Sequence, residues 1–184
     1  MTGAAPIPAR DFYFLRHGQT DGDLQRRAQR TADIALNEAG VAEAKDAANR
    51  FKGAGLIECI VSSPLRRAME TAAIVGDALK LPVRTDDALA ECNFGAEQGE
   101  FIGPWHSEWI DGITPKGADP YRAYVERSGR ALGRAISDAG TAPIVAHGGT
   151  YMAVTKYLLL SRPRKPPPDC VPLLHTPPQD LGNA

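Results

Sequence analysis

The chain has 184 residues, 43% of them hydrophobic and 23% charged, with a formal net charge of -1 at pH 7. This length suits one sizeable core, and the near-zero charge excludes bulk attraction to nucleic acid or to an anionic membrane. Cys59, Cys92 and Cys170 lack paired spacing, which argues against a disulfide framework or a zinc site. No stretch approaches about 18 apolar residues and no basic-then-apolar leader stands near residue 1, so we expect a cytoplasmic protein outside the membrane.

An abrupt change of character follows the first expected strand, at 11–15. The apolar run ends there in Arg16, His17 and Gly18, and glycine permits the tight turn that leaves a strand. Open α/β folds place their ligand sites at this edge of a sheet. The Arg-His-Gly tripeptide alone is a weak signal, however, and a surface turn explains it better.

The next elements form a helix, a strand and a second helix. The polar segment 21–35 is expected to be a loop or a broken helix. Asn37 can cap the helix that follows, and a short strand comes next at 57–61. Ser63 is the expected N-cap of the second helix, with Pro64 at its first position.

The rest of the chain continues this alternation. In order, we expect a strand at 81–85, a loop at 89–103, a short helix around Trp105 and Trp109, an amphipathic helix at 121–140, a strand at 143–146 and a helix after His147. The arginines of the 121–140 helix, Arg127 among them, are expected to form a solvated face. Alternation of this kind predicts an α/β fold, a three-layer αβα sandwich with a mostly parallel sheet.

A proline-rich segment ends the sequence. Residues 161–184 hold seven of the fifteen prolines, which prevents regular secondary structure over much of that length. We therefore expect a single domain at 1–160 and an extended tail at 161–184.

Polar residues of a matching kind follow three of the expected strands. Arg16 and His17 follow the first strand. Residues 62–67 follow the second, and His147 follows the fourth. The carboxyl ends of parallel strands share one edge of a sheet, so these groups should meet there. Imidazoles, guanidiniums and helix N-termini together favour an anion, above all phosphate, and disfavour a metal ion, for which carboxylate or thiolate ligands at usual spacing are also missing.

Five motifs in order resemble those of the histidine phosphatase superfamily, the phosphoglycerate-mutase-like enzymes. They are Leu15-Arg16-His17-Gly18-Gln19-Thr20, then 33–40 as "D-x-x-L-T-x-x-G", 62–72 as "S-S-x-L-x-R-A-x-x-T-A", 89–95 as "L-x-E-x-x-x-G", and 145–149 around the second histidine. Five ordered matches over residues 12–150 are far more specific than any one of them. The resemblance implies the phosphoglycerate-mutase-like form of the three-layer sandwich.

The resemblance also implies a covalent mechanism that needs no cofactor. His17 would attack phosphorus and become phosphohistidine, Glu91 would serve as general acid and base, and His147 would donate to the phosphoryl oxygens. Residue chemistry supports the nucleophile independently, because flanking arginines help to keep an imidazole unprotonated near pH 7. Without the resemblance, Glu91, Glu97 and Glu100 are almost equal candidates for the acid.

The resemblance also assigns residues to phosphate binding and shows where this chain departs from the family pattern. The resemblance assigns the phosphate to Arg16, Arg67 and Gly148. Asp23 stands where the family commonly has an asparagine, and it puts a negative charge where an anion should bind. Gln29 and Arg30 stand where the family often has a small hydroxyl or glycine pair. We take Asp23, Gln29 and Arg30 as candidate substrate contacts that indicate altered specificity or low activity.

Several functions stay open. The leading one is a metal-independent phosphomonoesterase acting on a small phosphorylated metabolite or a phosphohistidine protein. The connection from Glu91 to His147 is short for a mutase, which favours hydrolysis over phosphoglycerate mutase activity. The alternatives are a non-catalytic phosphate-binding or regulatory member of the fold, and a metallohydrolase. If Asn183-Ala184 is the pair before the family's closing strand, that strand is missing or supplied otherwise, and the exposed edge would invite a homodimer.

Overall fold

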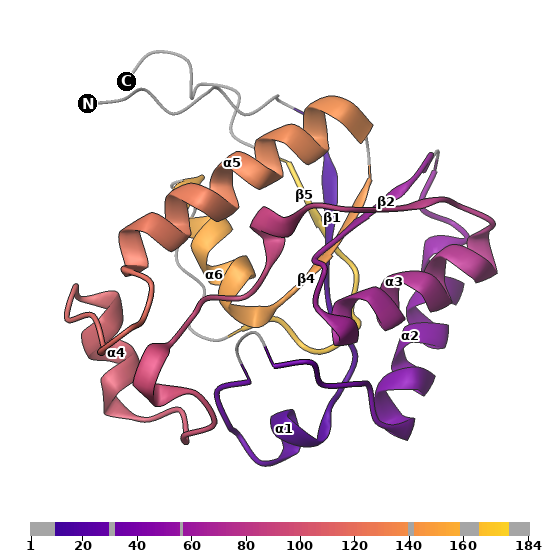
Figure 1. Ribbon diagram of the computed structural model, residues 1–184. Helices are drawn as coiled ribbons and strands as arrows, with labels where there is room; N and C mark the ends of the chain where they lie inside the picture. Colours follow the sequence, from indigo (N-terminus) through magenta and orange to yellow (C-terminus); the bar gives the residue numbers. More distant parts are fainter. Residues whose placement is uncertain (1–9, 30–31, 56, 140–141, 159–165, 177–184) are drawn as a thin grey trace.

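The computed structural model describes residues 10–29, 32–55, 57–139, 142–158 and 166–176, which build a five-stranded sheet between helices (Figure 1). The strands are β1 (Phe12–Arg16), β2 (Ile60–Ser62), β3 (Val83–Thr85), β4 (Pro143–Ala146) and β5 (Leu173–His175), in the order β3-β2-β4-β1-β5. The first four run parallel, and β5 pairs antiparallel with β1. The expected mostly parallel sheet is confirmed.

Helices cover both faces of this sheet (Figure 1). They are α2 (Glu38–Phe51) and α3 (Arg66–Leu79) on one face, and α5 (Tyr121–Ala139) and α6 (Gly148–Tyr157) on the other. Ala44 and Val75 bury the first pair against the strands, and Leu132 and Val154 bury the second pair. Two apolar clusters separated by the sheet make the three-layer αβα sandwich that the alternation predicts, so the α/β fold class is confirmed.

Short elements gather beyond the carboxyl ends of the parallel strands. They are α1 (Asp21–Leu24), α4 (Pro104–Ile110) and the 3-10 turn η2 (Gly95–Glu97), whereas a second 3-10 turn, η1 (Asp87–Leu89), packs Leu89 into the core beside α5. Figure 1 shows α1 below the lower end of the sheet and α4 to its lower left. The segment 21–35, expected to be a loop or a broken helix, thus begins with the single turn α1, and its other described residues form no further helix. Within the described ranges, no helix combines the length and the apolar character that a membrane span requires.

Two glycines fix the turn after β1 against the start of α2. A Cβ atom on Gly18 would lie 2.5 Å from the carbonyl oxygen of Gly40, and a Cβ on Gly40 would collide with the backbone of Gln19. The predicted cap of α2 is confirmed, because the Asn37 side chain accepts a hydrogen bond from the amide of Gly40 at 2.9 Å. The close packing of these backbones explains why the first two motifs each contain a glycine.

The start of α3 differs from the expectation. Ser63 is not the N-cap: α3 begins at Arg66, its N-cap is Leu65, and no side chain caps it. The hydroxyl of Ser63 instead lies 2.7 Å from Nε2 of His147. A contact between residues 84 positions apart has replaced the local cap.

The proline-rich segment also contributes to the sheet. Extended, irregular chain is wrong for 173–175, since β5 pairs with β1 in the register Phe12↔His175 and Phe14↔Leu173. The three residues of β5 lie between Pro172 and Pro177 and are free of proline, so each keeps the backbone N–H that a sheet needs. Residues 183–184, named above as a possible closing pair, lie outside the described residues. The division into a domain at 1–160 and a tail stays a prediction.

Candidate active site

A cavity of about 360 Å³ opens at the carboxyl edge of the sheet, where the predicted site residues meet. Seven of them line it: Arg16, His17, Asp23, Gln29, Arg67, Glu91 and Gly148. His147 lies behind His17, with 5.2 Å between the ring centroids. The structure thus brings together residues from β1, α3, the η1–η2 loop and α6. Arg30 lies outside the described residues.

Two contacts define the protonation of His17. Its Nδ1 lies 2.8 Å from the carbonyl oxygen of Gly18, and since a carbonyl can only accept, Nδ1 carries the proton. Its Nε2 accepts a hydrogen bond from Nε of Arg67 at 3.2 Å, which requires a lone pair on Nε2. The unprotonated nitrogen therefore faces the guanidinium that would hold a phosphate.

Burial and positive charge keep His17 neutral. Only 3% of the residue is exposed. Burial, and then the charge of Arg67, lower the pKa of His17 from 6.5 to about 3, although Asp23 opposes them. A buried imidazole whose Nε2 is unprotonated at neutral pH is suited to nucleophilic attack.

Arg67 is itself buried, with 1% exposure, in the first turn of α3. Its Nη1 donates to the carbonyl oxygen of Ala32 at 3.3 Å, in addition to the bond from Nε to His17. Burial lowers the pKa of Arg67 from its ordinary value, and Glu91 and Asp23 act in the opposite direction. Since arginine stays charged in proteins, Arg67 places a fixed cation beside Nε2 of His17.

Arg16 is held between two carboxylates. Its Nη2 contacts Oδ1 of Asp23 at 2.7 Å, and its Nε contacts Oδ1 of Asp169 at 2.9 Å. The other oxygen of Asp23 accepts from the amide and the hydroxyl of Thr20, which caps α1. Gln29 joins this network through a 2.8 Å contact with the same hydroxyl. Asp23 therefore both stabilises the loop and offsets the charge of Arg16.

His147 occupies the N-cap position of α6 and is fully buried. Burial, followed by the charge of Arg67, lowers its pKa well below 6.5. Its Nε2 lies 2.7 Å from the hydroxyl of Ser63, whereas its buried Nδ1 has no hydrogen-bond partner among the described residues. Gly148, the first residue of α6, lines the cavity, so the amide end of this helix faces the site.

Glu91 is held by donors from three segments. The hydroxyl of Tyr124 and the amide of Cys92 donate to its Oε1, and the amide of Gly149 donates to its Oε2 at 3.3 Å. A Cβ atom on Gly149 would collide with this carboxylate. Glu97 and Glu100 do not line the cavity, so the geometry separates Glu91 from the other two candidates.

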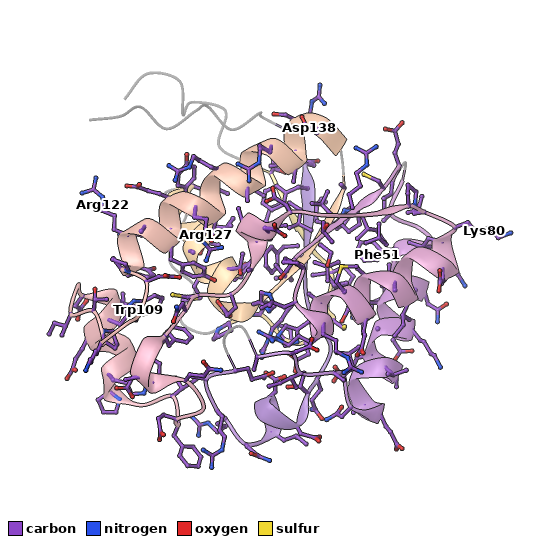
Figure 2. All side chains as sticks on the ribbon, in the orientation of Figure 1. Phe51, Lys80, Trp109, Arg122, Arg127 and Asp138 are labelled. Carbon is purple, nitrogen blue, oxygen red and sulfur yellow. The ribbon has the colours of Figure 1, made fainter. Side chains whose placement is uncertain are left out.

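Arg127 corrects the expectation of a solvated face on α5. In Figure 2, Arg122 extends away from α5, while Arg127 lies on the inner side of the helix. Arg127 donates to the carbonyl oxygens of Ala88 and Ala90 at 2.7 and 2.9 Å, and its guanidinium lies 5.0 Å from the ring centroid of Tyr124. The arginine thereby anchors the loop that carries Glu91.

Four residues of the site were not singled out for these roles from the sequence: Ser63, Tyr124, Arg127 and Asp169. Ser63 had a signal, since it belongs to the third motif. Tyr124 and Arg127 stand on an amphipathic helix whose pattern gives no sign of a site, and Asp169 stands in the proline-rich segment. Among the described residues, no group of three or more His, Cys, Asp and Glu side chains is arranged to hold a metal ion.

The fold and site together define an α/β protein with a buried, neutral histidine beside arginines at the carboxyl edge of its sheet. The sequence profile of the histidine phosphatase superfamily (branch 1) matches residues 12–170. The chain belongs to this superfamily.

Individual relatives agree with this family. The bifunctional protein Rv2228c of Mycobacterium tuberculosis is 36% identical over 157 residues, which are 79% of this chain and 43% of that protein. A probable phosphoglycerate mutase GpmB of Proteus mirabilis is 38% identical over 115 residues, 59% of this chain and 53% of that protein. The chain thus spans about half or less of the length of these two relatives.

A solved structure extends the likeness to three dimensions. The mycobacterial glucosyl-3-phosphoglycerate phosphatase Rv2419c, in complex with VO3, superposes with a TM-score of 0.73 at 32% identity. The match covers 84% of this chain and 83% of that one.

Proposed function

We propose that the protein is a metal-independent phosphomonoesterase that works through a phosphohistidine at His17 on a small phosphorylated metabolite. One observation carries this proposal: Nε2 of a neutral, buried His17 holds its lone pair 3.2 Å from the guanidinium of Arg67. A nucleophile and the cation that binds its electrophile are therefore adjacent before the substrate arrives.

The proposed reaction has two steps. Nε2 of His17 attacks phosphorus, the bond from phosphorus to the ester oxygen breaks, and Glu91, which must enter this step protonated, gives its proton to the departing oxygen. Water then attacks the phosphorus of the phosphohistidine, and Glu91 takes one proton from this water. As the water oxygen bonds to phosphorus, the bond from phosphorus to Nε2 breaks, its electron pair returns to His17, and phosphate leaves. Arg67, Arg16 and the amide end of α6 at Gly148 would stabilise the phosphoryl oxygens, together with His147.

Charge supplied by arginines supports independence from metal. Arg16 and Arg67 both line the cavity, and two guanidiniums can bind the dianionic phosphoryl group without a cation between them. The names of the relatives, a phosphatase and a probable mutase, support phosphoester chemistry in general. The short connection from Glu91 to His147 favours hydrolysis over transfer between two positions of one substrate.

A decisive experiment follows p-nitrophenyl phosphate hydrolysis in EDTA for the wild type and His17→Ala. We expect turnover in EDTA, its loss in the variant, and an acid-labile phosphoryl adduct trapped on His17. Turnover at the wild-type rate by His17→Ala would refute the assignment of His17 as the nucleophile. Loss of turnover in EDTA with recovery in zinc or manganese would favour a metallohydrolase instead.

A second candidate function rests on Arg16. Because Asp23 and Asp169 already engage this guanidinium, a phosphate-binding member with little turnover is the alternative. Normal binding of inorganic phosphate without hydrolysis of any ester would favour it over the enzyme.

The cellular compartment and the oligomeric state are also part of the proposal. Cys59, Cys92 and Cys170 are buried and form no disulfide among the described residues, which fits the reducing cytoplasm. A homodimer paired through the edge strand β5 would be detected by light scattering as a doubled mass.

A further inference from the structure

The cavity has a second region beyond the groups that would bind phosphate. Six apolar or aromatic residues line this outer region: Phe94, Ile102, Trp109, Ile110, Tyr121 and Met152. Phe94 directly precedes η2, Ile102 lies between η2 and α4, and the other four belong to α4, α5 and α6. This outer region is where the part of a substrate that leaves with the ester oxygen would lie.

Packed aromatic rings make much of this outer region apolar, although His106 and Ser107 of α4 also line the cavity. Trp109 contacts Phe94 and Tyr121 edge-on, with ring centroids 5.0 and 4.9 Å apart. The indole N–H of Trp109 donates to the carbonyl oxygen of Asp119, so its one polar group is already satisfied. The rings of Phe94 and Trp109 therefore present carbon rather than hydrogen-bonding groups to a ligand.

An apolar side chain at the rim of the cavity stays half-exposed in the folded protein. Ile102 is 51% exposed although it lines the cavity. Backbone pairing fixes it there, since the amide of Ile102 donates to Arg26 and Arg27 forms a bridge with Phe101. A half-exposed isoleucine on a fixed rim gains burial when an apolar group occupies the cavity.

Among the described residues, the arginines that line the cavity, Arg16, Arg27 and Arg67, each already contact other groups of the protein. Arg16 is paired with Asp23 and Asp169. Arg27 donates to the carbonyl oxygen of Gly99 at 2.7 Å and lies 4.7 Å from the ring centroid of Phe101. A substrate with a second negative group, such as the carboxylate of a sugar acid, would have to break one of these arrangements.

We infer that this outer region is a subsite for an uncharged, apolar leaving group, so that preferred substrates are phosphate monoesters of hydrophobic alcohols or phenols. The inference rests on the proposed phosphatase function. The cavity of about 360 Å³ is near the lower end of the usual range for ligand pockets, which limits the leaving group to a short chain or a small ring.

An alkyl series tests the subsite without changing the chemistry of the leaving oxygen. We expect kcat/KM to rise about threefold to fourfold per added methylene from ethyl to butyl to hexyl phosphate, until the cavity is full. We also expect hexyl phosphate to exceed 3-phosphoglycerate at least tenfold. Equal values across the series, or preference for 3-phosphoglycerate, would overturn the subsite.

Matched isoleucine variants separate the subsite from general effects on folding. Ile102→Ser should lower kcat/KM for hexyl phosphate about fivefold more than it lowers kcat/KM for ethyl phosphate. Ile113→Ser is the control, because Ile113 is 65% exposed and does not line the cavity; both substrates should keep their wild-type values. The same fall for both substrates in Ile102→Ser would contradict the inference.

The subsite and the proposed function can fail separately. His17-dependent hydrolysis of all alkyl phosphates at one rate would refute the subsite and leave the phosphatase standing. If no ester in the series is hydrolysed in a His17-dependent manner, the proposed function fails and the subsite with it.

Discussion

The hydroxyl of Tyr124 on α5 donates a hydrogen bond to Oε1 of Glu91, which lies 33 positions earlier in the chain. Tyr124 is buried, and burial together with the charge of Glu91 raises its pKa well above 10, so the phenol keeps its proton. With the amide of Gly149 on Oε2, this bond fixes the plane of the carboxylate. A rigid carboxylate is what the proposed proton transfer at the leaving oxygen requires.

Tyr124→Phe should therefore impair the transfer of a proton to the leaving group. We expect kcat/KM for an alkyl phosphate to fall about tenfold, because Glu91 loses one of its three donors and its orientation. The value for p-nitrophenyl phosphate should change less than twofold, since p-nitrophenolate leaves without a proton. An equal fall for both esters, measured on a variant of unchanged Tm, would assign Tyr124 a purely structural role.

Gly149→Ala should remove activity through a collision with Glu91. The added Cβ would meet the carboxylate, which must rotate away from the cavity. We expect a loss of at least about a hundredfold in kcat/KM with the fold retained in circular dichroism. Gly53→Ala is the matched control, because no atom lies within 4 Å of a Cβ at that position. Full activity in Gly149→Ala would show that the orientation of Glu91 does not matter.

The buried, neutral His17 predicts a loss of stability in mild acid. In the unfolded chain His17 binds a proton below about pH 6.5, but in the folded protein its pKa is about 3. Between these values the unfolded state binds more protons, so the free energy of unfolding decreases as the pH falls. Urea denaturation of His17→Asn should show a slope shallower by about 1.4 kcal/mol per pH unit in this window. Identical slopes for both proteins would contradict the lowered pKa.

The raised pKa of Asp169 predicts that the protein binds anions more tightly as the pH falls through 6. Burial raises the pKa of Asp169 to about 6, although Arg16 opposes this shift. Below that pH the carboxyl of Asp169 is neutral, so one of the two negative charges beside Arg16 is lost and Arg16 attracts an anion more strongly. Sulfate, which stays dianionic, should bind about threefold to tenfold more tightly at pH 5 than at pH 7.

The variant Asp169→Asn isolates this effect. Its sulfate affinity should be high and nearly independent of pH, as judged by calorimetry. Asp138→Asn, a change at an exposed position near the end of α5, should behave like the wild type. If Asp169→Asn keeps the wild-type pH dependence, another group controls the charge of the site.

The sequence by itself determined the layers and the edge at which the chemistry lies. Alternating strands and helices require a parallel sheet covered on both faces, and parallel strands bring their carboxyl ends together. His17 and His147, 130 positions apart, meet for that reason, because β1 and β4 are neighbours in the sheet. The motifs also contained Gly18 and Gly40, but they did not predict that the backbones of these two glycines are in contact.

Only the tertiary structure decided which polar groups control the site residues. Ser63 looked like a helix cap, yet it contacts His147. Arg127 looked solvated, yet it anchors the loop of Glu91, and Asp169 came from a segment expected to be a tail. Each of these pairings joins residues far apart in the chain, so no local periodicity encodes it; it follows from how buried donors and acceptors find partners once the core has formed.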